Sequence, residues 1–167
     1  MCDRMGREKA QDLSIPHAQL PMSPQSLSRV ACFFDGACPG NQFGTKGRMK
    51  AAYVIGEMEV VCDVPDLESS DGPKRSNNIA EYFGLIFLLR DLRDRDSAHN
   101  KRAKYLVCGD SELVIRQLRG EYRVRAPHLR ELQATASELA SGLDLKFREI
   151  PREENPAGFL LARLKGR

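Results

Sequence analysis

The chain has 167 residues, 41% of them hydrophobic, which predicts one domain with one core, and its net charge of +3 is too small to indicate a nucleic-acid partner by itself. No run approaches the roughly 18 apolar residues of a membrane-spanning helix, and the N-terminus lacks the apolar core of a secretory signal. Because the five cysteines form no CxxC pair and are typical of a reducing compartment, we expect a soluble, cytoplasmic monomer with no membrane partner.

Residues 1–28 mix charges with prolines and serines and have neither a helical nor a strand period. Such a composition predicts a mobile N-terminal tail, and a functional arm is the alternative. Residues 29–167, which contain no internal repeat or low-complexity tract, are the predicted folded domain.

The domain is predicted to open with an apolar strand that ends at Asp35, where a cluster of Gly, Pro and Asn residues stops it. A carboxylate held at the end of a rigid strand is well placed to share a metal ion with other acids. The alternative is an aspartate that opens a turn, because pairs such as Asp35-Gly36 are common turn formers.

Two more strands follow, at 51–56 and 58–64, and with the first they are expected to form an antiparallel meander. A long helix is then predicted over 77–92, because apolar residues recur there at helical spacing. Asn77 or Asn78 is expected to cap its first turn.

A fourth strand is predicted at 103–109, and Asp110 follows it directly, so a second strand ends in an aspartate beside a glycine. Glu81 lies in the first or second turn of the helix that connects these strands. It is the third acid of the pattern, although an acid near a helix N-terminus is also favourable for the helix dipole alone.

The rest of the chain predicts helices over 111–118 and 129–139, a strand over 143–150, and a last helix with Asn155 as its N-cap and Pro156 as its first helical residue. The first of these helices and the loop after it form the most basic segment, where a phosphate backbone could rest. A solvated polar loop is the alternative. The arginines of this basic segment include Arg116, Arg119, Arg123 and Arg125.

Strand–helix–strand connections are right-handed and join parallel strands, so the fourth strand is expected beside the first and the fifth beyond it. The predicted fold class is α/β, a five-stranded mixed sheet of three antiparallel and then two parallel strands flanked by helices. Asp35 and Asp110 then meet at one edge of the sheet, where Glu81 can join them. Converging carboxylates repel one another unless cations neutralise them, and an oxygen-only ligand set favours Mg²⁺ or Mn²⁺.

Four short segments occur in a fixed order: FDGACPGN at 34–41, SNNIAE at 76–81, GDSELVI at 109–115 and PREEN at 151–155. In order and in strand or helix context they resemble the motifs of the type 1 ribonucleases H, over roughly residues 29–165. The Gly120-Glu121-Tyr122 segment resembles the branch of that family that lacks the basic handle helix.

The resemblance implies a ribonuclease H-like fold and an endoribonuclease that hydrolyses the RNA strand of RNA–DNA hybrids with two divalent ions, Mg²⁺ or Mn²⁺. It implies that Asp35 bridges both ions and that Glu81 and Asp110 hold the second one. The family's contacts to RNA and to a DNA phosphate correspond to seven positions, to which the basic segment adds two arginines. These residues are Gly36, Ala37, Asn41, Lys74, Ser76, Asn77, Asn78, Arg119 and Arg123.

The chain departs from the family at the closing motif, which places an Asp four residues after the Asn. Counted from Asn155, that position holds Phe159, so the implied carboxylate ligand of the water-activating ion is missing. Glu153 or Glu154 could reach in instead, although an acid before a helix N-terminus usually compensates the dipole. Two functions stay open: a weakened or manganese-preferring endoribonuclease, and a catalytically silent hybrid-binding or scaffold domain. Phe159 is expected to point away from the apolar stripe of the last helix, Ala157, Leu160, Leu161 and Leu164.

Overall fold

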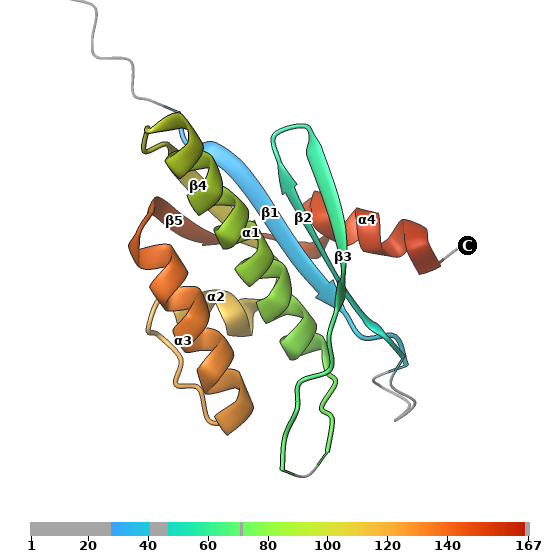
Figure 1. The fold of residues 1–167 in the computed structure, drawn as a ribbon. Helices are drawn as coiled ribbons and strands as arrows, with labels where there is room; N and C mark the ends of the chain where they lie inside the picture. The colour runs from blue at the N-terminus through green and yellow to red at the C-terminus, as the bar shows by residue number, and fades with distance from the viewer. Residues whose placement is uncertain (1–27, 41–46, 71, 166–167) are drawn as a thin grey trace, which may run out of the picture.

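The computed structural model describes residues 28–40, 47–70 and 72–165 of the chain. The predicted tail, apart from residue 28, and the predicted site residue Asn41 therefore lie outside the described residues. Figure 1 shows a twisted sheet with helices on both of its faces. In the part of the chain that the structure describes, no helix is long and apolar enough to cross a membrane.

A five-stranded mixed sheet forms the centre of the fold. Its strands are β1 (Val30–Ala37), β2 (Met49–Ile55), β3 (Met58–Val64), β4 (Lys104–Gly109) and β5 (Asp144–Glu149). They lie in the order β3-β2-β1-β4-β5, antiparallel from β3 to β1 and parallel from β1 to β5. This topology confirms the predicted α/β fold class and the predicted place of the fourth strand beside the first.

Within the described residues, four helices cover the sheet: α1 (Asn77–His99), α2 (Glu112–Leu118), α3 (Pro127–Ser141) and α4 (Pro156–Lys165), with a 3₁₀ turn at Arg152–Glu154. α1 lies across β1 and β2 and packs against α3, whereas α4 covers the opposite face (Figure 1). Alternation along β1 explains the two layers, because successive side chains of a strand point to opposite faces. Cys32 and Phe34 belong to the core under α1, and Phe33 packs toward α4.

α1 continues to His99, beyond its predicted end at residue 92. The additional turns carry many charges, and an ion pair of 2.7 Å between Arg95 and Asp91, one helical turn apart, supports them. The helix ends at Asn100, whose φ of 46° is the left-handed conformation common after helix C-termini. The prediction ended too early because the last buried apolar residue of the helix is Leu92, whereas the helix continues to His99.

The first turn of α1 is capped by Ser76, so the expectation that Asn77 or Asn78 caps it was wrong. Ser76 has an extended backbone, and its hydroxyl oxygen accepts a hydrogen bond from the Ile79 amide at 3.2 Å. Asn77 lies inside the helix, and its Oδ1 accepts a hydrogen bond from the Cys38 amide at 2.8 Å. Asn77 therefore connects the start of α1 to the chain that follows β1.

β1 does not end at Asp35 as predicted, because it continues to Ala37 in antiparallel pairing with β2. Its parallel pairing with β4 ends earlier, at Phe33 and Cys108. Asp35 therefore still lies beyond the end of the parallel pair, toward the edge of the sheet at which Asp110 follows β4. Asp35 and Asp110 therefore lie toward the same edge of the sheet, as predicted.

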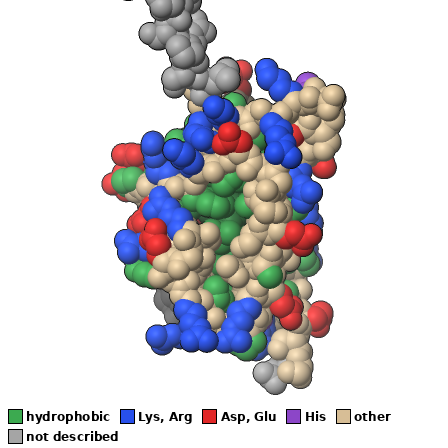
Figure 2. Space-filling model, turned by 90° about the vertical axis from the view of Figure 1, so that its left-hand side faces the viewer, with side chains coloured by type: hydrophobic (Ala, Val, Ile, Leu, Met, Phe, Trp, Pro, Cys, Tyr) green, Lys and Arg blue, Asp and Glu red, His purple; other side chains and the backbone are tan. Residues whose placement is uncertain are grey.

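Figure 2 shows the side of the molecule that carries β5 and α3. On this side Lys and Arg side chains lie among Asp and Glu side chains around a hydrophobic strip. The edge strand β5 takes part in ion pairs with its neighbours, from Arg29 to Asp144 at 2.9 Å and from Arg116 to Glu149 at 3.7 Å. The surface here is mixed in charge rather than uniformly basic.

Candidate active site

Asp35 lies where β1 approaches the start of α1. A Cβ atom at Gly36 would lie 2.1 Å from backbone atoms of Ala80 and Glu81, so only glycine allows this approach. Asp35 is 8% exposed, and its Oδ1 accepts a hydrogen bond from the Gly36 amide at 2.8 Å. The close packing of strand and helix therefore holds a buried carboxylate beside the helix turn that carries Glu81.

Glu81 is electrostatically coupled to both predicted aspartates. Burial raises the pKa of its carboxyl from 4.5 to about 7, a hydrogen bond of 2.6 Å from Ser111 Oγ to Oε2 opposes the shift, and the charges of Asp35 and Asp110 add to it. The charges of both predicted aspartates therefore act on the carboxyl of Glu81. Ser111 had no predicted role, although its place directly after Asp110 in the sequence is a signal for one.

Asn155 connects Asp110 to the other elements of the site. The Nδ2 group of this fully buried residue donates hydrogen bonds to Asp110 Oδ1 and, at 3.0 Å, to the carbonyl oxygen of Phe34. Its Oδ1 accepts a hydrogen bond from the Ala157 amide at 3.2 Å, which confirms the predicted N-cap of α4. The contacts to Asp110 and Phe34 were not predicted, because they depend on tertiary packing.

Removal of the Asn155 side chain is expected to destabilise the fold and the site together. Asn155→Ala loses an N-cap, at about 1 kcal/mol, and leaves the buried Phe34 carbonyl without its donor, at about 1–3 kcal/mol. Asn155→Ser should recover only the N-cap part, because serine caps well but is too short to reach Phe34. Urea unfolding of the three proteins measures both parts, and equal stability of wild type and Asn155→Ala would contradict the assigned contacts.

An oxygen-only ligand set such as Asp35, Glu81 and Asp110 suits Mg²⁺ or Mn²⁺. Each of these carboxylates has one oxygen hydrogen-bonded to a donor of the protein: a backbone amide, a hydroxyl or a side-chain amide. Among the residues that the structure describes, no three Asp, Glu, His or Cys side chains are close enough to hold one ion together. The donor chemistry fits a divalent cation, and joint coordination would require the carboxylates to turn toward a shared point.

The raised pKa of Glu81 predicts that stability in EDTA depends on pH. The folded state holds the proton more tightly than the unfolded state, with a pKa of about 7 against 4.5. The stabilisation is therefore complete below pH 4.5 and is lost as the pH rises through 7, by up to about 3 kcal/mol. Denaturant unfolding across this range should show the decline, and Glu81→Gln should flatten it. A wild-type free energy of unfolding that does not fall over this range would contradict the shift.

The predicted RNA contacts lie at the end of β1 and the start of α1. Gly36 and Ala37 are the last residues of β1, and the hydrogen bond from the Cys38 amide to Asn77 holds the following chain against the helix. Asn78 is half-buried in the first turn of α1. These residues therefore form a continuous border on one side of the acids.

Lys74 and Ser76, the predicted phosphate contacts, lie in the loop before α1. Two backbone hydrogen bonds of 2.8 and 3.1 Å join Lys74 to Leu67 across this loop. Arg75 forms a two-pronged contact with Asp66, with hydrogen bonds of 2.6 and 2.5 Å. The loop is thereby fixed close to the helix N-terminus.

The arginines of the basic segment divide into two pairs. Arg116 and Arg119 form ion pairs with glutamates of α2, β5 and the loop after α2. Arg123 and Arg125 are exposed and, within the described residues, form no ion pair. Both line a surface cavity of about 430 Å³ between α2 and the start of α3. A partner can therefore use the charges of Arg123 and Arg125, which are fewer than the composition of the segment indicates.

Phe159 lies on the solvent side of α4 and is 50% exposed, whereas Ala157, Leu160 and Leu161 are buried against the sheet. Its expected orientation away from the apolar stripe is confirmed. Leu164 is 41% exposed, so it is less buried than the other three residues of the predicted stripe, although with Leu161 it lines a surface cavity beside Ala37 and Lys50.

The first turn of α4 borders the acids through Gly158. A Cβ atom at this position would lie 3.2 Å from Asp35 Oδ2. Phe159 is the next residue, and Glu153 and Glu154 are exposed in the 3₁₀ turn before the helix. An exposed aromatic ring therefore follows directly on the residue that abuts Asp35.

No family model matches the chain. A curated relative, ribonuclease HI of Halobacterium salinarum, is 31% identical over 144 residues, which are 84% of this chain and 66% of that protein. The bifunctional protein Rv2228c of Mycobacterium tuberculosis is 34% identical over 83 residues, which are 49% of this chain and 21% of that protein. The chain thus spans just under two thirds of the first relative and about a fifth of the second.

Solved structures agree with this fold. RNase H1 of Halobacterium salinarum superimposes with a TM-score of 0.65 at 29% identity, over 84% of this chain and 100% of the solved one. LC11-RNase H1, isolated from compost by a metagenomic approach, has a TM-score of 0.63 at 30% identity, over 80% of this chain and 91% of its own. Sequence identity and strand topology over nearly the whole of these proteins show that the chain belongs to the type 1 ribonuclease H family.

Proposed function

We propose that this chain hydrolyses the RNA strand of RNA–DNA hybrids. Two observations on relatives support this: the halobacterial protein is a ribonuclease HI, and LC11-RNase H1, 29% identical, was solved in complex with an RNA/DNA hybrid. The observation on this chain that carries the proposal is the coupled set of Asp35, Glu81 and Asp110, since a binding module has no need for three mutually repelling acids.

The three acids are the proposed ligands of two divalent ions, with Asp35 shared between both and Glu81 and Asp110 holding the second. In such sites bound Mg²⁺ or Mn²⁺ activates water and stabilises the leaving 3′ oxygen. Ser111 and Asn155 orient Glu81 and Asp110 through the hydrogen bonds described above.

The substrate lies, in this proposal, along the border formed by the end of β1 and the start of α1. Gly36, Ala37, Asn77 and Asn78 face the RNA strand, whose 2′-hydroxyls distinguish it from DNA. The loop before α1 and the basic segment provide the phosphate contacts of the DNA strand. These contacts are Lys74, Ser76 and Arg123, with Arg119 restricted by its contacts within the protein.

A catalytically silent hybrid-binding domain is the second candidate, and Phe159 is the observation that favours it. An exposed ring at the proposed fourth-ligand position cannot coordinate a cation. If the chain is an endoribonuclease, the loss of this ligand should weaken metal binding, so that cleavage needs a higher Mg²⁺ concentration, or Mn²⁺.

The two candidates are separated by incubation with labelled hybrid, double-stranded RNA and single-stranded RNA, each in Mg²⁺ and in Mn²⁺. The endoribonuclease proposal predicts cleavage of the hybrid alone. Binding of the hybrid without cleavage in either ion would leave the silent domain, and equal cleavage of all three substrates would contradict hybrid specificity.

A further inference from the structure

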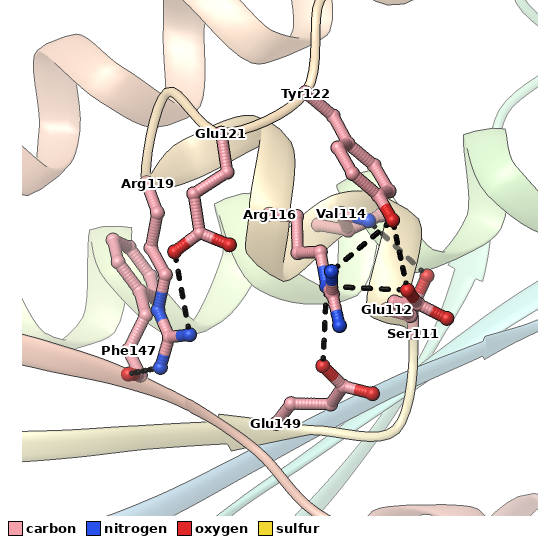
Figure 3. A network of polar contacts seen from close by, with 9 residues as sticks. All are labelled: Ser111, Glu112, Val114, Arg116, Arg119, Glu121, Tyr122, Phe147 and Glu149. Atoms are coloured by element: carbon pink, nitrogen blue, oxygen red, sulfur yellow. Dashed lines mark hydrogen bonds and ion pairs between the residues drawn. The ribbon is translucent and has the colours of Figure 1, made fainter.

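α2 and the end of β5 are joined by a network of polar contacts beside the proposed site (Figure 3). At its centre, Arg116 Nε lies 3.2 Å from Glu112 Oε1 and 3.7 Å from Glu149 Oε2. Arg116 Nη1 donates a hydrogen bond of 3.2 Å to the Tyr122 hydroxyl, which in turn donates one of 3.0 Å to Glu112. One guanidinium therefore bridges α2, β5 and the loop after α2.

Further contacts strengthen the same connection. The Arg116 guanidinium stacks over the Tyr122 ring at 5.2 Å from its centroid. Arg119 Nη2 donates a hydrogen bond of 2.7 Å to the carbonyl oxygen of Phe147 on β5 and pairs with Glu121 at 3.6 Å. The end of α2 and the loop are thus anchored to the same edge strand (Figure 3).

The network encloses the chain segment that carries two residues of the proposed site. Glu149 is the register partner of Gly109, the residue before Asp110. At the other end of the segment, Ser111 caps α2 by accepting a hydrogen bond from the Val114 amide at 3.4 Å. The same Ser111 hydroxyl donates to Glu81, so the position of α2 relative to β5 sets where this donor lies.

Stability alone is a weak explanation for the network. Its side chains are between about one third and one half exposed, and exposed ion pairs contribute little to folding. α2 has only seven residues, too few to be a stable helix by itself, so its orientation depends on such contacts.

We propose that Arg116 is a positioning residue, which fixes α2 against β5 and thereby aims the Ser111 hydroxyl at Glu81; this inference rests on the proposed function. Its charge is already paired with Glu112 and Glu149. Arg116 therefore acts within the protein and not on the substrate, in contrast to the exposed Arg123.

The test compares kcat, KM and the salt dependence of hybrid binding for wild type, Arg116→Met, Arg116→Lys and Tyr122→Phe. Methionine keeps the aliphatic stem and a similar helix propensity while it removes the charge. Arg116→Met should lower kcat by about 10-fold or more, as for other residues that orient site ligands, with KM and salt slope close to wild type. Arg116→Lys should restore part of kcat, and Tyr122→Phe should lower it less.

Arg163→Met is the matched control, because Arg163 of α4 forms an exposed ion pair with Glu59 of β3, outside the network, and its kcat, KM and salt slope should all stay close to wild type. Arg123→Met, at a proposed phosphate contact, should by contrast lower the salt slope by about 1. A wild-type kcat in Arg116→Met, or a salt slope lowered by about 1 in that variant, would overturn the positioning role. Both results presuppose a wild-type protein that cleaves the hybrid. A wild-type protein that does not cleave would overturn the proposed function, and this inference with it. A wild-type protein that cleaves, beside an Arg116→Met variant with unchanged kcat, would overturn this inference alone.

Discussion

Asp35→Asn is expected to reduce cleavage of an RNA–DNA hybrid by roughly a thousand-fold or more, the scale on which a group that acts electrostatically on the transition state is lost. The fold should survive the change. Asp35 contributes repulsion to Glu81, and its own hydrogen bond from the Gly36 amide can be accepted by an amide oxygen as well. The melting temperature in EDTA should therefore stay the same or rise.

Asp63→Asn is the matched control, since Asp63 is an exposed aspartate on β3 that pairs with Lys50. It should leave both activity and melting temperature close to wild type. A large fall in the melting temperature of Asp35→Asn would identify Asp35 as a residue that stabilises β1 and its contact with α1, and the metal interpretation of the acids would fail.

Phe159→Asp is expected to increase cleavage at low Mg²⁺ concentration, by about tenfold or more. The variant would add a carboxylate in the first turn of α4, next to the residue that abuts Asp35. Its cost in stability should be within about 0.5 kcal/mol, because half of the Phe159 surface is exposed and an acid is favourable at a helix N-terminus.

Phe159→Ala separates the effect of the new carboxylate from the loss of the ring. Titration of rate against Mg²⁺ for the three proteins, alongside their melting curves, gives the answer. A gain in Phe159→Asp alone supports the proposed fourth-ligand position. A similar gain in both variants would mean that the ring only obstructs the site, and no gain in either would direct the search to Glu153 and Glu154.

The sheet and its topology could be predicted because strand patterns and crossover handedness depend on local sequence and general geometry. β3 was predicted with its observed bounds, and β4 and β5 lie where the crossover rule places them. The first and last residues of α1 could not be predicted from hydrophobic periodicity. Its last turns lack an apolar period, and its cap is decided by which residue first leaves the helical conformation, here Ser76.

The acids of the candidate site could be proposed from the sequence because two aspartates lie at or near the ends of strands that become neighbours in the sheet. The residues that orient them could not. Asn155 and Ser111 act across distances of 45 and 30 residues in sequence, and only the packed structure brings them to Asp110 and Glu81. For the basic segment, in contrast, the sequence predicts more than the structure supports. Its composition predicts a binding face, while the structure engages Arg116 and Arg119 in ion pairs within the protein.

The most direct test of the account is end analysis of an RNA–DNA hybrid after incubation with the protein in Mg²⁺, with Asp35→Asn beside it. We expect internal cuts in the RNA strand that leave 3′-hydroxyl and 5′-phosphate ends, an intact DNA strand, and no cuts with the variant. The reason is that Asp35, Glu81 and Asp110 would hold ions that supply an activated water and stabilise the leaving 3′ oxygen. An intact RNA strand in both Mg²⁺ and Mn²⁺, or identical cuts with wild type and variant, would contradict it.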